Sequence, residues 1–248
     1  MNILQDYIVP VVRLKEDRGR IRFVQLHGTA FFINSRGAFM TAAHVIREAA
    51  ENVDKFGGRI ALTMRKPDDD QSRYVGDIID FTVADESYDV AVGCVAQPSK
   101  SCFAPANTDK VLAWDIVYTA GYAESALSRD GKSVRPDTRN LMGNLVRKVP
   151  AGSFLSNLGP HPPAFEVSFP IPNCMSGSPL VLRYGPDDEP PPDAPFPLLG
   201  VCTGNAEYSV GTDTMEQYGV VHDLWSLRDW KPECLSGETL FRAIRPEG

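Results

Sequence analysis

Residues 28–45 read GTAFFINSRGAFMTAAHV, and this stretch decides the fold class. Two apolar runs, each long enough for a strand, flank the segment NSRG at positions 34–37. Asn and Gly tolerate the positive φ that tight hairpin turns require, so the stretch predicts a β-hairpin. His44 follows the second run, and a histidine in that place, taken alone, is more often a hydrogen-bonded structural residue than a catalytic one.

The rest of the chain also consists of short apolar runs separated by turn residues, which is typical of an all-β sandwich or barrel. Two helices are predicted, one following His44 through Ala50 and one over Gly237–Ile244 that Ser236 would cap. Strands are predicted over Tyr7–Leu14, Phe23–Ile33, Ala38–Ala42, Arg59–Met64, Ile78–Val83, Asp89–Val95, Ile116–Tyr122, Asn144–Val149, Ala164–Phe169, Leu180–Arg183, Leu198–Thr203 and Tyr218–His222.

A polar segment with one proline, Ser99–Asp109, divides these strands into two sets of about six. Six strands suffice to close a small barrel and hide its edges. We therefore expect an all-β fold of two six-stranded antiparallel barrels with a short C-terminal helix. The expected division is residues 1–100 for the N-terminal barrel, 101–112 for a linker, 113–230 for the C-terminal barrel and 231–248 for the C-terminal helix and tail.

Composition limits the classes of partner. The 248 residues carry a formal net charge of −7, whereas binding to nucleic acid or to an anionic membrane requires clustered Lys and Arg. No apolar run approaches the roughly 20 residues that cross a bilayer. We expect neither nucleic acid nor membrane as a partner.

The five cysteines are scattered and odd in number, and none forms a C-x-x-C pair, so we expect no zinc site or redox motif. The first residues have neither the basic start nor the apolar stretch of a signal peptide. Reduced thiols in a cytoplasmic protein are the expected state, with no metal and no other cofactor.

Three segments carry groups that suit catalysis. His44 ends the first stretch, Asp89 lies inside the apolar run SYDVAV, and Ser176 lies among small residues in PNCMSGSPLV. A buried carboxylate is costly unless it has a hydrogen-bonding partner. A serine hydroxyl needs a neutral imidazole to take its proton, and that imidazole needs an acid to fix its tautomer. Each segment alone could be an ordinary turn or strand, but together they predict a catalytic triad.

These segments resemble the motifs of trypsin-like serine proteases: TAAHV at 41–45, DVAV at 89–92 and SGSPL at 176–180. The spacings, 45 residues from His44 to Asp89 and 87 from there to Ser176, suit one barrel followed by another. The nearest branch is that of the bacterial Deg-type and glutamyl-endopeptidase-like enzymes. The resemblance implies a chymotrypsin-like double barrel and a serine endopeptidase acting through an acyl-enzyme intermediate on a protein or peptide substrate.

The resemblance also implies roles around the triad. The backbone N–H groups of Cys174 and Ser176 would form the oxyanion hole. The strand over residues 200–204 would pair with substrate, and the strand over 218–221 would line the specificity pocket. The residues expected to bind substrate are Cys202, Thr203, Gly204 and Gly219. Because no charge is expected in this pocket, small to medium uncharged side chains are the expected preference.

Cys174 departs from the family pattern, which has glycine there. A residue with a Cβ is penalised by roughly 1–2 kcal/mol in left-handed backbone. Either the peptide before Cys174 is flipped and the enzyme is latent until a substrate or an activating protein partner orders the hole, or Cys174 has an ordinary φ and the hole is preformed.

Two rival hypotheses use the same residues. One is a catalytically inactive protease-fold scaffold that binds protein partners, and the other is a cysteine nucleophile at Cys174. The intact triad argues against the scaffold. Viral relatives with a nucleophilic cysteine have glycine directly after it. Here Met175 follows Cys174, which argues against the Cys174 thiol as the nucleophile.

Overall fold

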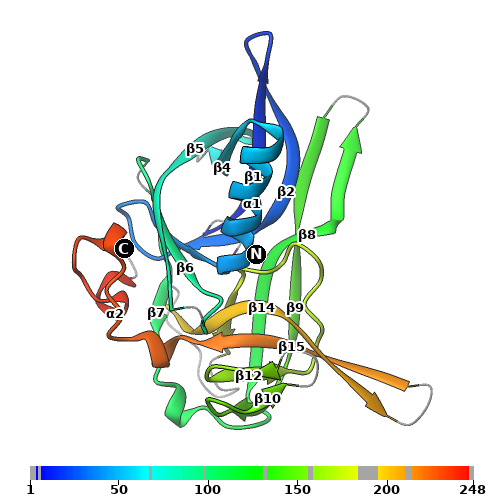
Figure 1. Ribbon diagram of the computed structural model, residues 1–248, viewed down its shortest axis with the longest axis vertical. Coiled ribbons are helices and arrows are strands. Elements are labelled where there is room, and N and C mark those ends of the chain that lie inside the picture. Colours follow the sequence, from blue (N-terminus) through cyan, green and yellow to red (C-terminus); the bar gives the residue numbers. More distant parts are fainter. Residues whose placement is uncertain are drawn as a thin grey trace.

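The computed structural model describes residues 4, 7–66, 69–85, 87–97, 99–130, 133–155, 159–183, 195–210 and 214–245. Two β-barrels lie against each other, with the N-terminal barrel at the top of Figure 1 and the C-terminal barrel below it. The predicted all-β double-barrel fold is confirmed.

The first barrel is closed, with strand order β1-β2-β3-β6-β5-β4. Its predicted hairpin is present: β2 pairs with β3, and Asn34 Oδ1 accepts the backbone N–H groups of Arg36 and Ala38. Gly37 is required in this turn because its φ is +83° and a Cβ would lie 2.3 Å from Val95 O. The strands are β1 (Ile8–Asp17), β2 (Arg20–Phe32), β3 (Ala38–Thr41), β4 (Arg59–Lys66), β5 (Asp69–Val83) and β6 (Ala91–Val95).

Helix α1 (Ala43–Phe56) begins one residue before His44 and runs further than predicted. Its buried residues, Ala43, Val45, Ile46 and Ala49, lie at helical spacing on one face. The helix ends at Gly57, whose φ of +71° lets its N–H bond to Val53 O. The helix thus continues to Phe56, beyond Ala50, where the sequence analysis ended it, and its buried residues all lie in the part before Ala50.

The second barrel is a ring of six strands in the order β13-β8-β9-β12-β15-β14, which β13–β14 pairing closes. A seventh short strand, β7, pairs in parallel with β14 and lies inside the expected linker. The strands of this half are β7 (Phe103–Pro105), β8 (Ile116–Asp130), β9 (Ser133–Val149), β10 (Phe154–Leu155), β11 (Gly159–Pro160), β12 (Ala164–Val167), β13 (Pro179–Leu182), β14 (Phe196–Val210) and β15 (Thr214–Asp223), and a 3₁₀ turn, η2, spans Thr108–Lys110.

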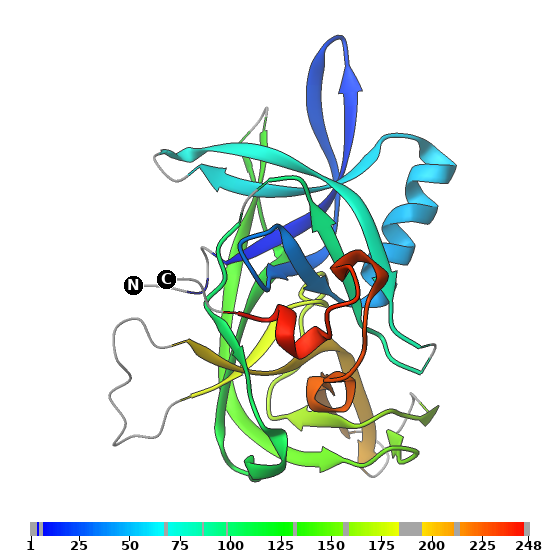
Figure 2. The same ribbon diagram turned by 90° about the vertical axis from the view of Figure 1, so that its left-hand side faces the viewer.

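The C-terminal segment packs along the first barrel (Figure 2). It contains η4 (Leu224–Leu227), η5 (Glu233–Leu235) and α2 (Leu240–Ala243). The predicted cap is wrong: Thr239 is the N-cap of α2, whereas Ser236 ends η5 in left-handed backbone. The helix is four residues long because the chain first turns through left-handed backbone at Ser236 and Gly237 and is extended at Thr239.

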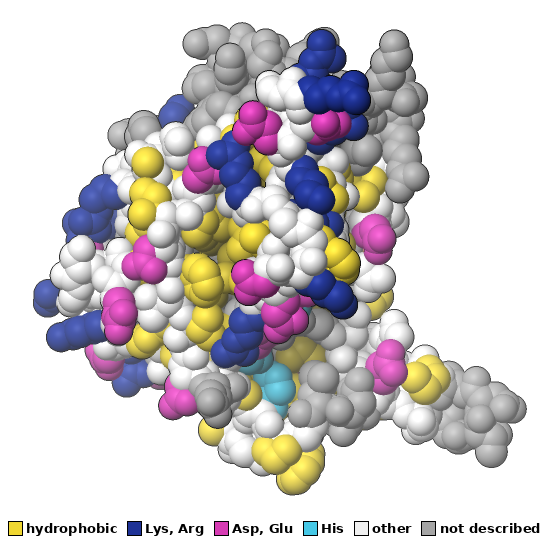
Figure 3. All heavy atoms as spheres, turned by 45° about the horizontal axis from the view of Figure 1, so that its top comes forward, with side chains coloured by type: hydrophobic (Ala, Val, Ile, Leu, Met, Phe, Trp, Pro, Cys, Tyr) yellow, Lys and Arg dark blue, Asp and Glu magenta, His cyan; other side chains and the backbone are white. Residues whose placement is uncertain are grey.

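One large apolar cluster joins the two barrels. It contains Phe31 and Phe39 of the first barrel together with Phe103, Tyr122 and Val201 from beyond it. This shared core fixes the first barrel against the loop that carries Ser176. On the face in Figure 3, basic and acidic side chains are interspersed around exposed apolar ones.

None of the helices formed by the described residues has the length and apolar character that crossing a membrane requires. In the same part of the chain, no group of three or more His, Cys, Asp or Glu side chains is placed to hold a metal ion.

Candidate active site

His44 and Asp89 form a two-point contact between the start of α1 and the residues just before β6. Asp89 Oδ1 accepts the backbone N–H of His44 at 2.7 Å, and Asp89 Oδ2 lies 2.5 Å from His44 Nδ1. Burial alone would raise the pKa of Asp89, but the hydrogen bonds and the charge of His44 outweigh it and hold that pKa below its usual value. The carboxylate is therefore ionised at neutral pH and fixes the ring of His44.

Ser176 lies in residues 172–178, between β12 and β13, a loop called the nucleophile loop after the role that the sequence predicts for Ser176. Gly177 has a φ of +89°, and a Cβ there would lie 2.0 Å from Thr29 O. Its N–H bonds to Cys202 O at 2.7 Å. Glycine is thus required after the serine, because the loop turns sharply against strand β2.

Thr29, a fully buried residue of β2, holds this loop from the other barrel. Its backbone N–H donates to Ser176 O at 2.9 Å, and its Oγ1 donates to Cys174 O at 3.1 Å. The same Oγ1 accepts the N–H of Tyr122 at 2.8 Å. One side chain therefore ties the first barrel, β8 and the nucleophile loop together.

Ser176 and His44 line the same cleft, which has a volume of about 500 Å³. The Ser176 hydroxyl donates to Thr203 O at 3.3 Å. Within the described residues, no hydrogen bond joins it to the imidazole of His44. The three predicted residues thus share one site, with the serine–histidine bond not yet formed.

Cys174 has a φ of +67°, so the expectation of an ordinary φ at this position is wrong. The flipped alternative is not found either, because Asn173 O accepts the N–H of Glu124 at 3.0 Å. This bond turns the 173–174 carbonyl toward β8. Among the described residues, neither the Cys174 N–H nor the Ser176 N–H has an acceptor.

The four residues expected to bind substrate differ in what they expose. Cys202 is fully buried, and its N–H and C=O bond to Ser178 O and Gly177 N–H of the nucleophile loop. It supports the loop and offers no group to a substrate. Thr203 sits at a bulge in the β14–β15 pairing, and open space surrounds the Cα of Gly204.

Gly219 lies on β15 between β12 and β14. A Cβ at this position would lie 2.6 Å from Phe169 O, so the strand packs closely against residues 169–171. Asn205 holds that segment from β14 with two hydrogen bonds to the backbone of Ile171. The strand expected to line the specificity pocket thus packs on a tied segment in which Phe169 and Ile171 are buried.

His222 and His161 were missed by sequence reasoning. His222 Nδ1 accepts the backbone N–H of Asp89 at 3.0 Å, and its Nε2 lies 3.1 Å from His161 Nε2. Burial, then the charge of His161, lowers the pKa of His222 to about 3. The only signal in the sequence was the strand pattern YGVVH at the end of β15. In this pattern His222 lies on the same face of the strand as the apolar Val220.

Another buried histidine, His27, lies in the wall of the cleft. His27 of β2 is 6% exposed, and neither ring nitrogen has a hydrogen-bonding partner within the described residues. Glu48 lies 3.6 Å away and, with Glu124, gives this end of the cleft an acidic rim. Burial lowers the pKa of His27, so the ring is neutral at neutral pH.

Comparison with known proteins agrees with this geometry. The HtrA-type protease AlgW with a decapeptide is 13% identical, with a TM-score of 0.55 over 91% of this chain and 64% of that chain. Deg5 is 15% identical, with a TM-score of 0.55 over 91% and 88%. The chain spans less than two thirds of the AlgW chains, and identities this low establish the fold alone.

No curated protein matches the sequence significantly. Residues 28–186 match the family described as the trypsin-like peptidase domain. That segment is more than half of the chain and contains His44, Asp89 and Ser176. The chain therefore belongs to the family of trypsin-like peptidase domains.

Proposed function

We propose that this chain is a serine endopeptidase that hydrolyses peptide bonds through an acyl-enzyme intermediate, with Ser176 as nucleophile. The observation that carries the proposal is the two-point contact of Asp89 with His44 in the cleft that Ser176 lines. The carboxylate accepts the Nδ1–H of His44, which leaves Nε2 as the basic nitrogen. His44 acts first as base toward the serine and then as acid toward the leaving amine.

Substrate binding would complete the triad. The Ser176 hydroxyl is bonded to Thr203 O, an acceptor at the bulge of β14. An extended peptide that pairs with β14 donates a backbone N–H to this same carbonyl. The hydroxyl is then displaced and rotates toward His44 Nε2, so that the nucleophile is activated when a peptide is present.

The backbone N–H groups of Cys174 and Ser176 form the oxyanion hole in this proposal. Because Glu124 N–H already holds the carbonyl of Asn173, the hole needs no activating partner. Burial, then the charges of Glu124 and Glu48, raises the pKa of the Cys174 thiol to about 11. The thiolate is therefore scarce at neutral pH, which argues against Cys174 as the nucleophile.

The substrate in this proposal is an unfolded protein or a peptide in extended conformation. Thr203 and Gly204 offer it a strand edge, while Gly219 and the tied 169–171 segment limit the depth of the pocket. Small to medium uncharged side chains before the scissile bond remain the proposed preference. We also propose a cytoplasmic location, because reduced cysteines are usual there.

Labelling with a fluorophosphonate probe tests the nucleophile directly. The wild type should be labelled at Ser176, whereas Ser176→Ala with an unchanged thermal midpoint should not. Mass spectrometry of a denatured proteome digest then reports cleavage and specificity. A folded wild type that takes no label and cleaves nothing would support the inactive scaffold, in which the Ser176–Thr203 bond persists.

A further inference from the structure

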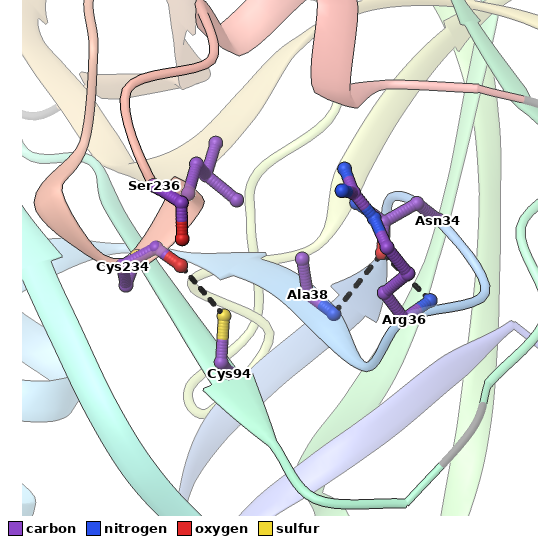
Figure 4. Close-up of a pocket in the computed structure, with 7 residues that line it drawn as sticks. Asn34, Arg36, Ala38, Cys94, Cys234 and Ser236 are labelled. Atoms are coloured by element: carbon purple, nitrogen blue, oxygen red, sulfur yellow. Dashed lines mark hydrogen bonds between the residues drawn. The ribbon is translucent and has the colours of Figure 1, made fainter.

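A second pocket, whose lining residues differ from those of the cleft, lies where η5 packs against β6. Figure 4 shows Cys94 of β6 and Cys234 of η5 on facing walls of this pocket. Its volume is about 160 Å³. The residues that line it are Asn34, Arg36, Ala38, Cys94, Cys234, Leu235 and Ser236.

The two cysteines are neighbours across the pocket. Cys94 Sγ lies 3.3 Å from Cys234 O, Cys234 Sγ lies 3.3 Å from Val92 O, and each thiol shifts the pKa of the other. Both side chains are half-buried, so a small solute can reach them through the pocket. Because Cys94 Sγ contacts the backbone of Cys234, an S–S bond of ~2 Å would need movement of the two side chains and little movement of the chain.

The two thiols differ in pKa because each affects the other. The hydrogen bond from Cys94 lowers the pKa of Cys234 to about 7 and raises the pKa of Cys94. Asp80 acts to raise the pKa of both thiols, and Arg36 acts to lower that of Cys94. Near neutral pH, Cys234 is thiolate in a large part of the molecules while Cys94 keeps its proton. The thiolate is the form that reacts with oxidants.

Several contacts hold the C-terminal segment so that the thiols face each other. Thr82 Oγ1 accepts the N–H of Cys234 at 3.4 Å, and Arg36 forms a 2.5 Å ion pair with Glu238. Further along, Asn34 Nδ2 donates to Ala243 O at 3.2 Å. The pair is therefore preorganised by anchors on both sides of it.

We propose that Cys94 and Cys234 are an oxidation site, at which a hydroperoxide such as hydrogen peroxide closes a reversible disulfide. The thiolate of Cys234 attacks one peroxide oxygen, the O–O bond breaks, and the departing hydroxide takes a proton to become water. Cys94 Sγ then attacks the sulfur of the resulting sulfenic acid. The hydroxide that leaves takes the proton of Cys94, so two thiols and one peroxide give one disulfide and two waters.

This site is separate from the peptidase chemistry and does not rest on it. The disulfide joins residues 140 positions apart in sequence and ties the C-terminal segment to β6. A cross-link over so long a loop restricts the unfolded chain strongly. Oxidation would thus stabilise the chain while leaving the residues of the cleft in place.

The test uses the purified, fully reduced protein treated with hydrogen peroxide and then digested under non-reducing conditions. The intact mass should fall by about 2 Da, the mass of two hydrogen atoms, and the map should contain the Cys94 peptide linked to the Cys234 peptide. The thermal midpoint should rise by roughly 5–15 °C and return after treatment with dithiothreitol.

Cys94→Ser and Cys234→Ser should each abolish the mass loss, whereas Cys102→Ser, a change at another half-buried cysteine, should leave it intact. Linkage between other cysteines or between two chains would overturn the proposal. So would a stable sulfinic acid on Cys234 beside a reduced Cys94, or a linked protein that melts no higher than the reduced one.

Discussion

The backbone N–H of Asp89 donates a hydrogen bond to His222 Nδ1 at 3.0 Å, behind the carboxylate that holds His44. Because an amide can only donate, Nδ1 of His222 is unprotonated and its Nε2 carries the hydrogen. That hydrogen points at His161 Nε2, which must accept, and His161 Nδ1 donates to Pro162 O. The two rings are therefore neutral, with fixed tautomers, and they position the loop that carries Asp89.

Two substitutions at His222 separate hydrogen bonding from ring packing. His222→Asn keeps an acceptor near the position of Nδ1 and should retain turnover within about threefold. His222→Leu leaves the N–H of Asp89 buried without an acceptor, which costs about 1–3 kcal/mol of stability. It should also lower turnover by tenfold or more, because the carboxylate shifts against His44. Equal turnover in the two variants, measured well below both thermal midpoints, would refute this role.

The same pair predicts how stability depends on pH. The pKa of His222 is lowered to about 3 in the folded chain, and that of His161 is lowered too, whereas both titrate near 6.5 when unfolded. The unfolded state therefore binds more protons below about pH 6.5. Stability is fully present above that pH and is lost as the pH falls toward 3, by on the order of 1 kcal/mol per pH unit for His222, with a further loss in the same direction from His161.

Protonation of Asp89 also lowers the stability of the folded chain as the pH falls, but at lower pH than the histidines. Because its folded pKa is lowered, its contribution is present above about pH 4 and is lost below it. Thermal midpoints measured from pH 8 to pH 4 should fall in the wild type and fall less steeply in His222→Asn, which has one titrating ring fewer. Parallel curves for the two proteins would show that folding does not lower the pKa of His222.

Asp89→Asn tests the orientation of His44. The amide would keep its oxygen on the backbone N–H of His44 and present its NH2 group to Nδ1, where the carboxylate now accepts from both. The imidazole would then be held in the wrong tautomer, and a loss of turnover of about 10⁴ is expected from the general behaviour of such triads. The comparison is with Asp85→Asn, a change at an exposed acid on the same loop. A loss below tenfold in Asp89→Asn would exclude Asp89 as the orienting acid.

The sequence pattern correctly predicted those parts of the site that a single short segment of the chain determines. The NSRG turn, the strand before His44 and the glycine after Ser176 each follow from the φ values or the burial that a short segment requires. The His222–His161 pair could not be found in that way. Its members lie 61 residues apart and meet only because β15 pairs with β12 next to the loop of Asp89.

The errors at Cys202 and Ser236 have a related cause. Motif position predicted that Cys202 faces substrate, but in the folded chain its backbone is used by the nucleophile loop. Serine is a frequent N-cap, yet Ser236 ends η5, because the backbone first turns through left-handed residues. At Cys202 a contact from a distant loop, and at Ser236 a left-handed turn, overrides what the local pattern indicated.

Thr29→Val tests the tie between the first barrel and the nucleophile loop. Valine has the same shape but removes the hydroxyl that bonds Cys174 O and Tyr122 N–H. We expect a loss of about 1–3 kcal/mol in unfolding free energy and at least a tenfold loss of turnover. Thr119→Val is the matched control, since that buried hydroxyl contacts Cys202 Sγ at 3.7 Å and not the loop. Turnover reduced equally in both variants would indicate general destabilisation.

The last prediction concerns the strain at Cys174. Its φ of +67° costs a residue with a Cβ roughly 1–2 kcal/mol, and Cys174→Gly removes that cost together with some packing. Because the bond from Glu124 N–H to Asn173 O already orients the hole, we expect turnover to change by less than threefold. Glu124→Pro removes that donor at a point where β8 is not paired with β9, and turnover should fall by about 10² as an oxyanion donor turns away. Glu124→Ala keeps the N–H and should retain the activity. A tenfold gain in Cys174→Gly without any partner, or full activity in a folded Glu124→Pro, would mean that the hole is not held by this bond.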